Sequence, residues 1–300
     1  MYRSALDHLM TDEERDHFET RGFLPVENAL TSEEVDALLG EVDRLHREAR
    51  DAGDKRATED GAWGKADIVG LSEPFTNLSD NPRVLPKVWG TMGWNIMLYH
   101  THLHVKPPAP DAEEGEGWME FHQDSGRVNL EMRTFPQARI SLKVAYFLTD
   151  VSEPGRGNFY ILPGSHISDT IPISSEIGRD PAEARSEGIP EGAIPVCAKP
   201  GTAVLFDRRL WHGRSANQST LTRKALFYGY SYRWIQPKDA MTIEHLLEDA
   251  DPVRRQMLGS VVNNNGRYVP VDEDVPLRGW LIEHLGEEAV AEMDEPALVL

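Results

Sequence analysis

The chain has little of three features that would assign it to particular classes of protein: cysteine, long apolar runs and positive charge. Its single cysteine, Cys197, cannot form a disulfide within the chain and excludes a cysteine-rich metal site. No apolar run approaches the roughly 18 residues of a membrane-spanning helix. Lysine and arginine number 31 against 50 aspartates and glutamates, a net charge of −19. That acidic excess argues against nucleic acid and anionic membranes as partners.

The same features predict a globular, cytoplasmic protein. One cysteine fits a reducing compartment, and the first residues are too charged for a signal peptide. The composition, 40% apolar and 27% charged, is typical of a globular protein with a substantial core. The sequence leaves the oligomeric state open between monomer and homodimer.

The N-terminal part is expected to be helical. Thr11-x-x-Glu14 and Thr31-x-x-Glu34 are capping-box patterns, in which each side chain bonds a free amide of the other residue. A short strand is expected at 22–26 and a further helix from about Asn81. Helical spacing after the second capping box gives one apolar stripe, made of Val35, Leu38, Leu39, Val42 and Leu45.

From about residue 94 the pattern changes to short β-branched and aromatic segments separated by Pro and Gly. They predict a sandwich or jelly roll rather than a parallel α/β fold. We expect one domain over 1–300, with a helical part at about 1–92, a jelly-roll core at 93–236 and an appended segment at 237–300. Helical signals recur there at 241–247 and 279–293. The expected strands are 94–105, 139–149, 158–162, 193–198, 202–206 and 224–234.

Two histidines and one aspartate are candidate metal ligands. If His122 and Asp124 lie on one strand, the two-residue period points both side chains to the same face. A second strand carrying His212 would then complete the facial arrangement of non-haem Fe(II) oxygenases, which leaves coordination positions open. A His-x-Asp pair with one distant histidine also occurs often by chance.

Four motifs in register make the chain similar to the phytanoyl-CoA dioxygenase family of Fe(II)- and 2-oxoglutarate-dependent oxygenases, over roughly 15–235. The resemblance implies a double-stranded β-helix, the cupin-like jelly roll, flanked by helices. It implies Fe(II), 2-oxoglutarate and O2, with His122, Asp124 and His212 holding the iron. The retained Asp124 favours hydroxylation over halogenation. The motifs are 100–108, His122-Gln123-Asp124, 162–166, and His212 with Asn217 and Arg223.

The resemblance also implies the residues that bind 2-oxoglutarate. Arg223 would pair with the distal carboxylate, which a guanidinium matches in two parallel hydrogen bonds; a surface salt bridge is the alternative. Gln123 would reach the cosubstrate only through a bulge, because it faces away from the ligands on a regular strand. His102, Lys106 and Arg214 are further candidates, Lys106 being equally explicable as a solvated residue. Ala145 stands where the family often has Trp.

Substrate contacts are expected from three places. His104 shares a strand face with His100 and His102, which form either a pocket wall or a row of hydrogen-bonded strand histidines. The 125–138 connection leaves directly after Asp124 and is expected to form a lid, with a solvated connector as the alternative. It carries Arg127, the best candidate for an anionic group, and Asn129. The remaining candidates are Tyr230 and Arg233.

The sequence therefore predicts a dioxygenase that hydroxylates an unactivated C–H bond and releases succinate and CO2. Desaturation, ring closure and epimerisation share the same ligands. The alternatives are a catalytically silent jelly roll that binds iron and 2-oxoglutarate, and a zinc-dependent cupin-like hydrolase. A small metabolite or natural-product intermediate is favoured as substrate, because no basic patch suits a CoA diphosphate.

Overall fold

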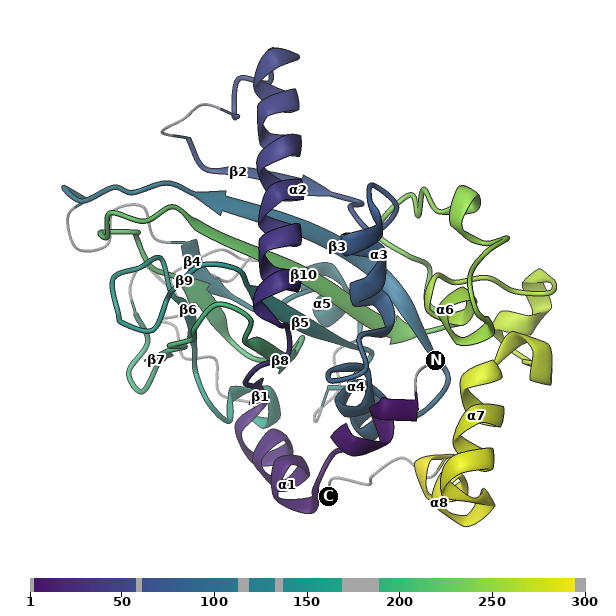
Figure 1. Cartoon of the computed structure of the whole chain (residues 1–300). Coiled ribbons are helices and arrows are strands. Elements are labelled where there is room, and N and C mark those ends of the chain that lie inside the picture. The colour runs from purple at the N-terminus through teal and green to yellow at the C-terminus, as the bar shows by residue number, and fades with distance from the viewer. Residues whose placement is uncertain (1–2, 58–60, 113–118, 133–136, 169–188, 295–300) are drawn as a thin grey trace. The chain divides into compact units, whose positions relative to one another are not determined.

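The computed structural model describes residues 3–57, 61–112, 119–132, 137–168 and 189–294 (Figure 1). Its helices are α1 (Asp12–Arg21), α2 (Ser32–Asp51), α3 (Glu73–Asn77), α4 (Leu85–Met92), α5 (Gly126–Glu131), α6 (Pro252–Met257), α7 (Pro276–Leu285) and α8 (Glu287–Asp294). Its strands are β1 (Phe23–Val26), β2 (Trp63–Ala66), β3 (Ile96–Lys106), β4 (Met119–His122), β5 (Ser141–Phe147), β6 (Phe159–Ile161), β7 (Ile194–Pro195), β8 (Ala203–Asp207), β9 (His212–Arg214) and β10 (Arg223–Tyr232).

The strands form two sheets. A six-stranded sheet has the order β1-β8-β5-β10-β3-β2, and a four-stranded sheet has the order β4-β9-β6-β7. The pairs β1 with β8, β5 with β8, β4 with β9 and β6 with β9 are antiparallel. Two antiparallel sheets flanked by helices confirm the mainly β jelly-roll class. The strands expected at 94–105, 139–149, 158–162, 202–206 and 224–234 are confirmed to within a few residues.

Packing divides the chain into two compact units, each made of segments that are separate in the sequence. One comprises Asp16–Lys65 and Leu103–Phe227, and the other Met1–Arg15, Ala66–His102 and Tyr228–Leu300. The strands β3 and β10 run from one unit into the other. The expected division into 1–92, 93–236 and 237–300 stays a prediction. The packing divides the chain differently, because α2 belongs to the same unit as the four-stranded sheet and as β1, β5 and β8 of the larger sheet.

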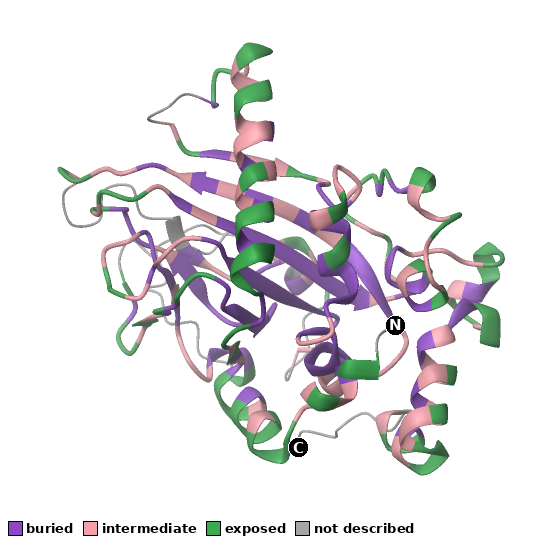
Figure 2. Ribbon diagram, in the orientation of Figure 1, coloured by how far each residue is buried: buried purple, intermediate pink, exposed green. Residues whose placement is uncertain are grey.

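The core of that unit lies between the two sheets. Alternate residues of β5, β8 and β10 point to it from the larger sheet, and Phe159 and Ile161 from the smaller one, as the two-residue period of a strand requires. Figure 2 shows these strands as almost entirely buried. Full burial of each large apolar side chain contributes about 1.5–3 kcal/mol, so this cluster stabilises the packing of β5, β6, β8 and β10. The alternating pairs are Ala145 and Phe147, Val204 and Phe206, and Ala225 and Phe227.

The capping boxes are confirmed. The amide of Thr31 donates to Glu34 at 2.7 Å and the amide of Glu34 donates to Thr31 at 3.2 Å. The same reciprocal bonds join Thr11 and Glu14, at 2.8 and 3.2 Å. The expected stripe of α2 is buried except for the half-buried Leu39, and the opposite face is exposed (Figure 2).

In the other unit, helical segments accompany the remaining halves of β3 and β10. The helix expected at 279–293 is two helices, α7 and α8, because the chain turns at Gly286 with φ 92°. The signal at 241–247 gives only a single 3₁₀ turn, Glu244–Leu246. Within the described ranges no helix is long and apolar enough to cross a membrane.

Candidate metal centre

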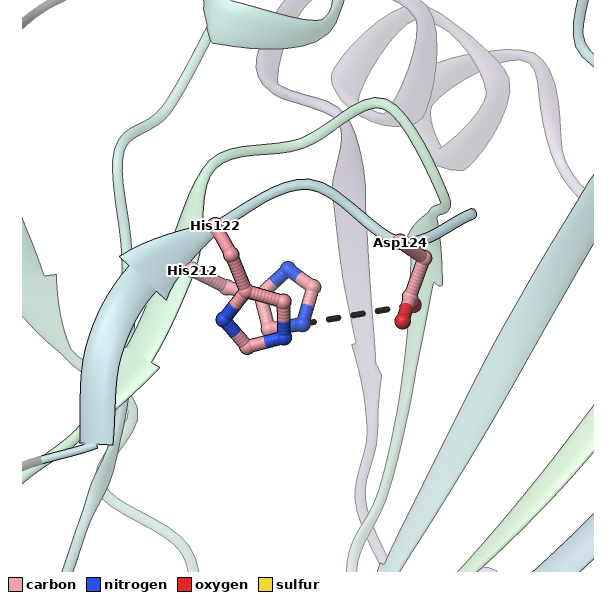
Figure 3. Close-up of side chains that lie close together, drawn as sticks. All are labelled: His122, Asp124 and His212. Carbon is pink, nitrogen blue, oxygen red and sulfur yellow. Dashed lines mark ion pairs between the residues drawn. The ribbon is translucent and has the colours of Figure 1, made fainter. Parts of the chain in front are cut away.

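His122 and His212 lie opposite each other on neighbouring strands. His122 is the last residue of β4 and His212 the first of β9, and the two are paired in register. Their ring centroids are 4.4 Å apart. The antiparallel pairing therefore brings together two imidazoles that are 90 positions apart in the sequence (Figure 3).

Asp124 reaches the same place from a turn and not from the strand. β4 ends at His122, and Ser125 adopts a left-handed conformation with φ 59°. His122 and Asp124 therefore do not lie on one strand, as had been considered, but their side chains still come together with that of His212. The amide of Asp124 donates to the carbonyl of Arg208 at 2.9 Å, and this bond sets the position of the turn.

The three side chains form a set of ligand atoms that could hold a metal ion. One ligand atom from each residue lies within 4.8 Å of the others. Oδ2 of Asp124 is 3.9 Å from Nε2 of His212, too far for a hydrogen bond. That oxygen is buried and has no hydrogen-bond partner among the described residues. A buried carboxylate oxygen facing two imidazoles fits a divalent metal held by two histidines and one carboxylate.

The environment of His212 prepares it to be a ligand. Its Nδ1 lies 2.8 Å from the carbonyl oxygen of Leu210, which can only accept, so the ring proton sits on Nδ1 and the Nε2 lone pair points to the site. Burial, and then the proximity of His122, lower the pKa of His212 to about 3. The imidazole is therefore neutral at neutral pH, as metal binding requires.

Asp124 is held ionised by a buried lysine. Nζ of Lys143, on β5, lies 2.7 Å from Oδ1 of Asp124, and both side chains are buried. Burial alone would raise the pKa of this carboxyl group. The Lys143 ammonium and the neighbouring histidines outweigh burial and hold the pKa of Asp124 well below its usual range.

One turn between β8 and β9 supports two of the three candidate ligands, Asp124 and His212, and the intervening Gln123. Three successive carbonyls each accept one hydrogen bond: Arg208 from the Asp124 amide, Arg209 from the Gln123 side chain, and Leu210 from His212. Sequence reasoning missed this support. The available signal was the run of charged residues, 207–209, directly after an apolar strand.

The Gln123 side chain makes structural contacts within the protein. Its side-chain nitrogen donates to the carbonyl of Arg209, and its oxygen lies 3.5 Å from the Asn129 amide nitrogen. The expected cosubstrate contact of Gln123 remains a prediction.

Arg223, Arg214 and Lys106 form a cluster of cations that has no salt-bridge partner among the described residues. Arg223 is 2% exposed, its Nε and Nη1 have no hydrogen-bond partner within the described part of the chain, and its guanidinium lies 5.6 Å from the centroid of the Phe147 ring. Burial and the neighbouring Arg214 lower the pKa of Arg223 to about 9. Burial also lowers the pKa of Arg214 and of Lys106, the latter with a contribution from Arg214.

No described carboxylate forms a salt bridge with any of these three cations, so the surface salt bridge considered for Arg223 is not present among them. A buried guanidinium with unused donors fits an anionic ligand.

Two neighbours shape the space around Arg223. Asn217 donates to the carbonyls of Lys106 and Leu221, at 3.0 and 2.7 Å, which fixes the loop before β10. Gly157 has φ +68°, and a Cβ placed there would lie 3.2 Å from Cδ of Arg223 and 3.3 Å from Cβ of Asn217. Gly157 therefore provides both an unusual backbone conformation and room for the arginine stem.

The histidines of β3 have separate environments. His104 is half-buried, with its ring 5.5 Å from that of Phe227. His102 belongs to the other unit and packs at 4.6 Å against His100, whose Nδ1 lies 2.6 Å from Asp239. His100 thus fits the hydrogen-bonded alternative, whereas for His102 the structure gives the ring contact with His100, and His104 remains a proposed pocket residue.

The expected lid is only partly described, since 133–136 lie outside the described residues. Its first part is the short helix α5. Arg127 is exposed and pairs with Glu131 at 2.7 Å. Asn129 is buried, donates to the carbonyl of Asp124 at 3.1 Å and accepts from Arg208. The amide of Asn129 is therefore used within the protein, which argues against the substrate contact expected for it.

Tyr230 and Arg233 also serve internal contacts. The Tyr230 hydroxyl donates to the carbonyls of Leu78 and Ser79 at 3.3 and 3.1 Å, and Arg233 donates to the carbonyl of Gly266 at 3.1 Å. Both residues belong to the unit that does not contain the triad. The substrate contacts expected for them stay predictions.

Comparison with known proteins gives consistent matches. The family profile described as phytanoyl-CoA dioxygenase matches residues 18–225, which include all three ligands and Arg223. The ectoine dioxygenase of Bordetella parapertussis is 28% identical over 233 residues, 71% of this chain and 73% of that protein.

Solved structures resemble the fold. HygX from Streptomyces hygroscopicus, with nickel and 2-oxoglutarate bound, has a TM-score of 0.59 at 20% identity and covers 76% of this chain and 89% of its own. The carbocyclase SnoK from nogalamycin biosynthesis has a TM-score of 0.57 at 19% identity, covering 81% and 91%. The fold is thus the cupin-like jelly roll that was expected.

Proposed function

Because the chain belongs to the phytanoyl-CoA dioxygenase family, whose oxygenases depend on Fe(II) and 2-oxoglutarate, we propose that it hydroxylates an unactivated C–H bond of a small metabolite or natural-product intermediate. Succinate and CO2 are the co-products. One observation carries the proposal: a buried carboxylate oxygen faces neutral His212 and lies in the same unit as the buried Arg223, and neither the oxygen nor the Nε and Nη1 of Arg223 has a hydrogen-bond partner in the described part of the chain.

The residues of the chain have separate tasks. His122, Asp124 and His212 hold Fe(II), with Nε2 of His212 and Oδ2 of Asp124 already turned toward each other. When bound, Fe(II) and 2-oxoglutarate supply the oxidising power, since the 2-oxo acid is decarboxylated while O2 is reduced. The remaining residues position the reactants and exclude water, which suppresses side reactions.

Arg223 binds the distal carboxylate of 2-oxoglutarate. Its guanidinium offers a planar pair of donors that matches a carboxylate, and the unused Nε and Nη1 are available for it. Arg214 and Lys106 add positive charge near Arg223. The same cations weigh against the zinc-hydrolase alternative, because a hydrolytic reaction needs no buried, unpaired arginine.

The substrate class is supported by the relatives and by charge. The similar protein from Bordetella parapertussis is named for ectoine, a small molecule. SnoK is titled a carbocyclase, so ring closure on this fold is a second outcome. The net charge of −19 supports the absence of nucleic acid among the partners. Cytoplasmic location, and a monomer or homodimer, complete the proposal.

The test is an anaerobic titration with Fe(II) and 2-oxoglutarate, followed by a panel of metabolites in air with succinate as the readout. We expect tight binding of both and succinate formation that one class of substrate stimulates. Hydrolysis supported by zinc without 2-oxoglutarate would establish the hydrolase instead. Binding of both ligands without succinate, under every condition, would establish the silent binding protein.

A further inference from the structure

We propose that Lys143 is a positioning residue that restricts Asp124 to one metal-binding oxygen. The Lys143 ammonium donates to Oδ1 of Asp124 at 2.7 Å. The other oxygen, Oδ2, accepts no hydrogen bond from the described residues and is the one nearest His212, at 3.9 Å from Nε2. The two oxygens of one carboxylate therefore have different partners before any metal binds.

Lys143 occupies a buried position, where a lysine is energetically unfavourable. All seven residues of β5 are buried, and Lys143 is the only charged one among them. Burying an ammonium group is unfavourable unless it is paired and hydrogen-bonded. Asp124 provides that pair from a segment 19 residues away in the sequence. β5 otherwise contributes to the apolar core, and Lys143 places its positive charge next to one carboxylate oxygen of Asp124.

The restriction matters for the number of open metal positions. Two histidines and a monodentate carboxylate leave three positions of an octahedral metal free, two for the 2-oxo acid and one for O2. A carboxylate that bound through both oxygens would occupy one of these. With Oδ1 held by Lys143, only Oδ2 is presented, and the third position stays open.

The charge of Lys143 has the opposite effect on metal affinity. An ammonium group 2.7 Å from a ligand repels an incoming cation while it neutralises Asp124 in the metal-free site. Removing Lys143 should therefore not weaken metal binding, although it should change how the metal is bound. A residue needed only for folding would give the reverse: weaker binding with an unchanged coordination geometry.

The experiment compares Lys143→Met with wild type by anaerobic Co(II) titration, in which visible d–d absorption reports coordination number and geometry. We expect Lys143→Met to bind Co(II) at least as tightly as wild type, with an altered d–d spectrum. The charge-transfer band of the Fe(II)–2-oxoglutarate complex should shift or weaken, and succinate formation should fall at least about tenfold. Identical d–d spectra for the two proteins would overturn the proposal.

The matched control is Lys87→Met. Lys87 is buried to the same degree, with 8% of its side chain exposed against 9% for Lys143, and pairs with Glu14 at 2.5 Å. Its loss should lower stability and leave the Co(II) spectrum unchanged. Should Lys143→Met fail to fold, Lys143→Gln decides. The amide nitrogen of glutamine lies one bond short of the lysine Nζ and loses the hydrogen bond to Oδ1, so an altered spectrum is again expected, and a spectrum identical to that of wild type would overturn the proposal.

This inference rests on the proposed metal centre, and different experimental results would contradict the proposed function and the role of Lys143. If wild type does not bind Co(II) or Fe(II), both the proposed function and the role of Lys143 are removed. If wild type binds the metal and 2-oxoglutarate but Lys143→Met is spectroscopically indistinguishable from it, only the role of Lys143 is removed.

Discussion

His122, Asp124 and His212 differ in burial, and this difference decides how each responds to substitution. Asp124 and His212 are buried, whereas His122 is half-buried. His122→Ala should therefore disturb folding least. We expect His122→Ala, His212→Ala and Asp124→Asn each to abolish succinate formation and metal retention, because a site with three protein ligands tolerates little loss of them.

Metal content, succinate and thermal unfolding would be measured on each purified variant. His166→Ala is the control: His166 is buried, its Nε2 lies 3.0 Å from the Glu19 carbonyl, and it is not a ligand. It should lose stability and keep the metal. Near-normal succinate from any two of the ligand variants would contradict the triad.

Arg223 is the residue on which cosubstrate affinity depends. Arg223→Ala should raise the 2-oxoglutarate requirement by about 30-fold to a few thousand-fold, since losing the partner of a buried carboxylate costs roughly 2–5 kcal/mol. Lysine at this position should rescue only in part, because it lacks the planar pair of donors.

The measurement is the 2-oxoglutarate dependence of succinate formation. Arg233→Ala serves as control, because Arg233 is equally buried, 0% exposed against 2% for Arg223, and belongs to the other unit. It should reduce stability without changing that dependence. An unchanged 2-oxoglutarate requirement in Arg223→Ala would mean that the anchor lies elsewhere.

Among the elements, α5 has one fixed face and one free face. Asn129 fixes it to Arg208 and to the Asp124 carbonyl, whereas Arg127 and Glu131 are exposed. An exposed pair of this kind is worth about 0.5 kcal/mol or less. It can be exchanged at little cost for a contact between Arg127 and a substrate anion.

We therefore expect Arg127→Ala to keep its stability within about 0.5 kcal/mol while raising KM for an anionic substrate. Hydrogen exchange over 126–132 should slow when Fe(II), 2-oxoglutarate and substrate are all present, if the segment closes as a lid. Equal exchange in every state, together with unchanged turnover in Arg127→Ala, would leave α5 as a connector.

Elements defined by local pattern were predictable, and those defined by distant contacts were not. The apolar alternation of β5, β8 and β10 and the capping box at Thr31 are readable from neighbouring residues. The turn at Asp124 is not, because its position depends on the carbonyl of Arg208, far along the chain.

The same distinction applies to single residues. Arg223 stands at a recognisable distance from His212, so its role could be inferred. For Tyr230 and Arg233 no such spacing was available, because a place in β10 or just after it does not tell to which unit a residue belongs. The contact of Lys143 with Asp124 could not be predicted from the sequence, because it depends on how the turn at Asp124 lies against β5 in the folded chain.

At the scale of the whole molecule, one buried ion network makes stability depend on pH. Asp207 accepts from Arg209 at 2.6 and 2.8 Å and from Arg139 at 2.8 Å, and Arg139 also binds Glu19 of α1. Burial would raise the pKa of Asp207, but Arg209 and Arg139 hold it well below its usual range.

A depressed pKa stabilises the fold above the unfolded value of about 3.9, and this stability is lost as the pH falls through the folded pKa. Asp207→Asn should cost roughly 3–5 kcal/mol at pH 7, because it leaves buried guanidinium charge uncompensated. Below about pH 3.9 the difference from wild type should narrow.

Urea unfolding at a series of pH values checks this prediction. Asp150→Asn is the control, since Asp150 makes a more exposed ion pair with Arg156 and should change stability little at any pH. A constant difference between Asp207→Asn and wild type across the whole range would show that the charge of Asp207 is not what stabilises the fold.

Gly157 limits how this protein can vary. It has no functional group, yet any side chain there would meet both an unfavourable backbone conformation and the stem of Arg223. A Gly157→Ala variant should behave like a protein with a damaged cosubstrate site, although every side chain proposed to contact 2-oxoglutarate is still present. When natural or engineered variants of this chain are ranked for loss of activity, position 157 therefore belongs beside the charged residues, although a comparison of side-chain chemistry alone would pass it over.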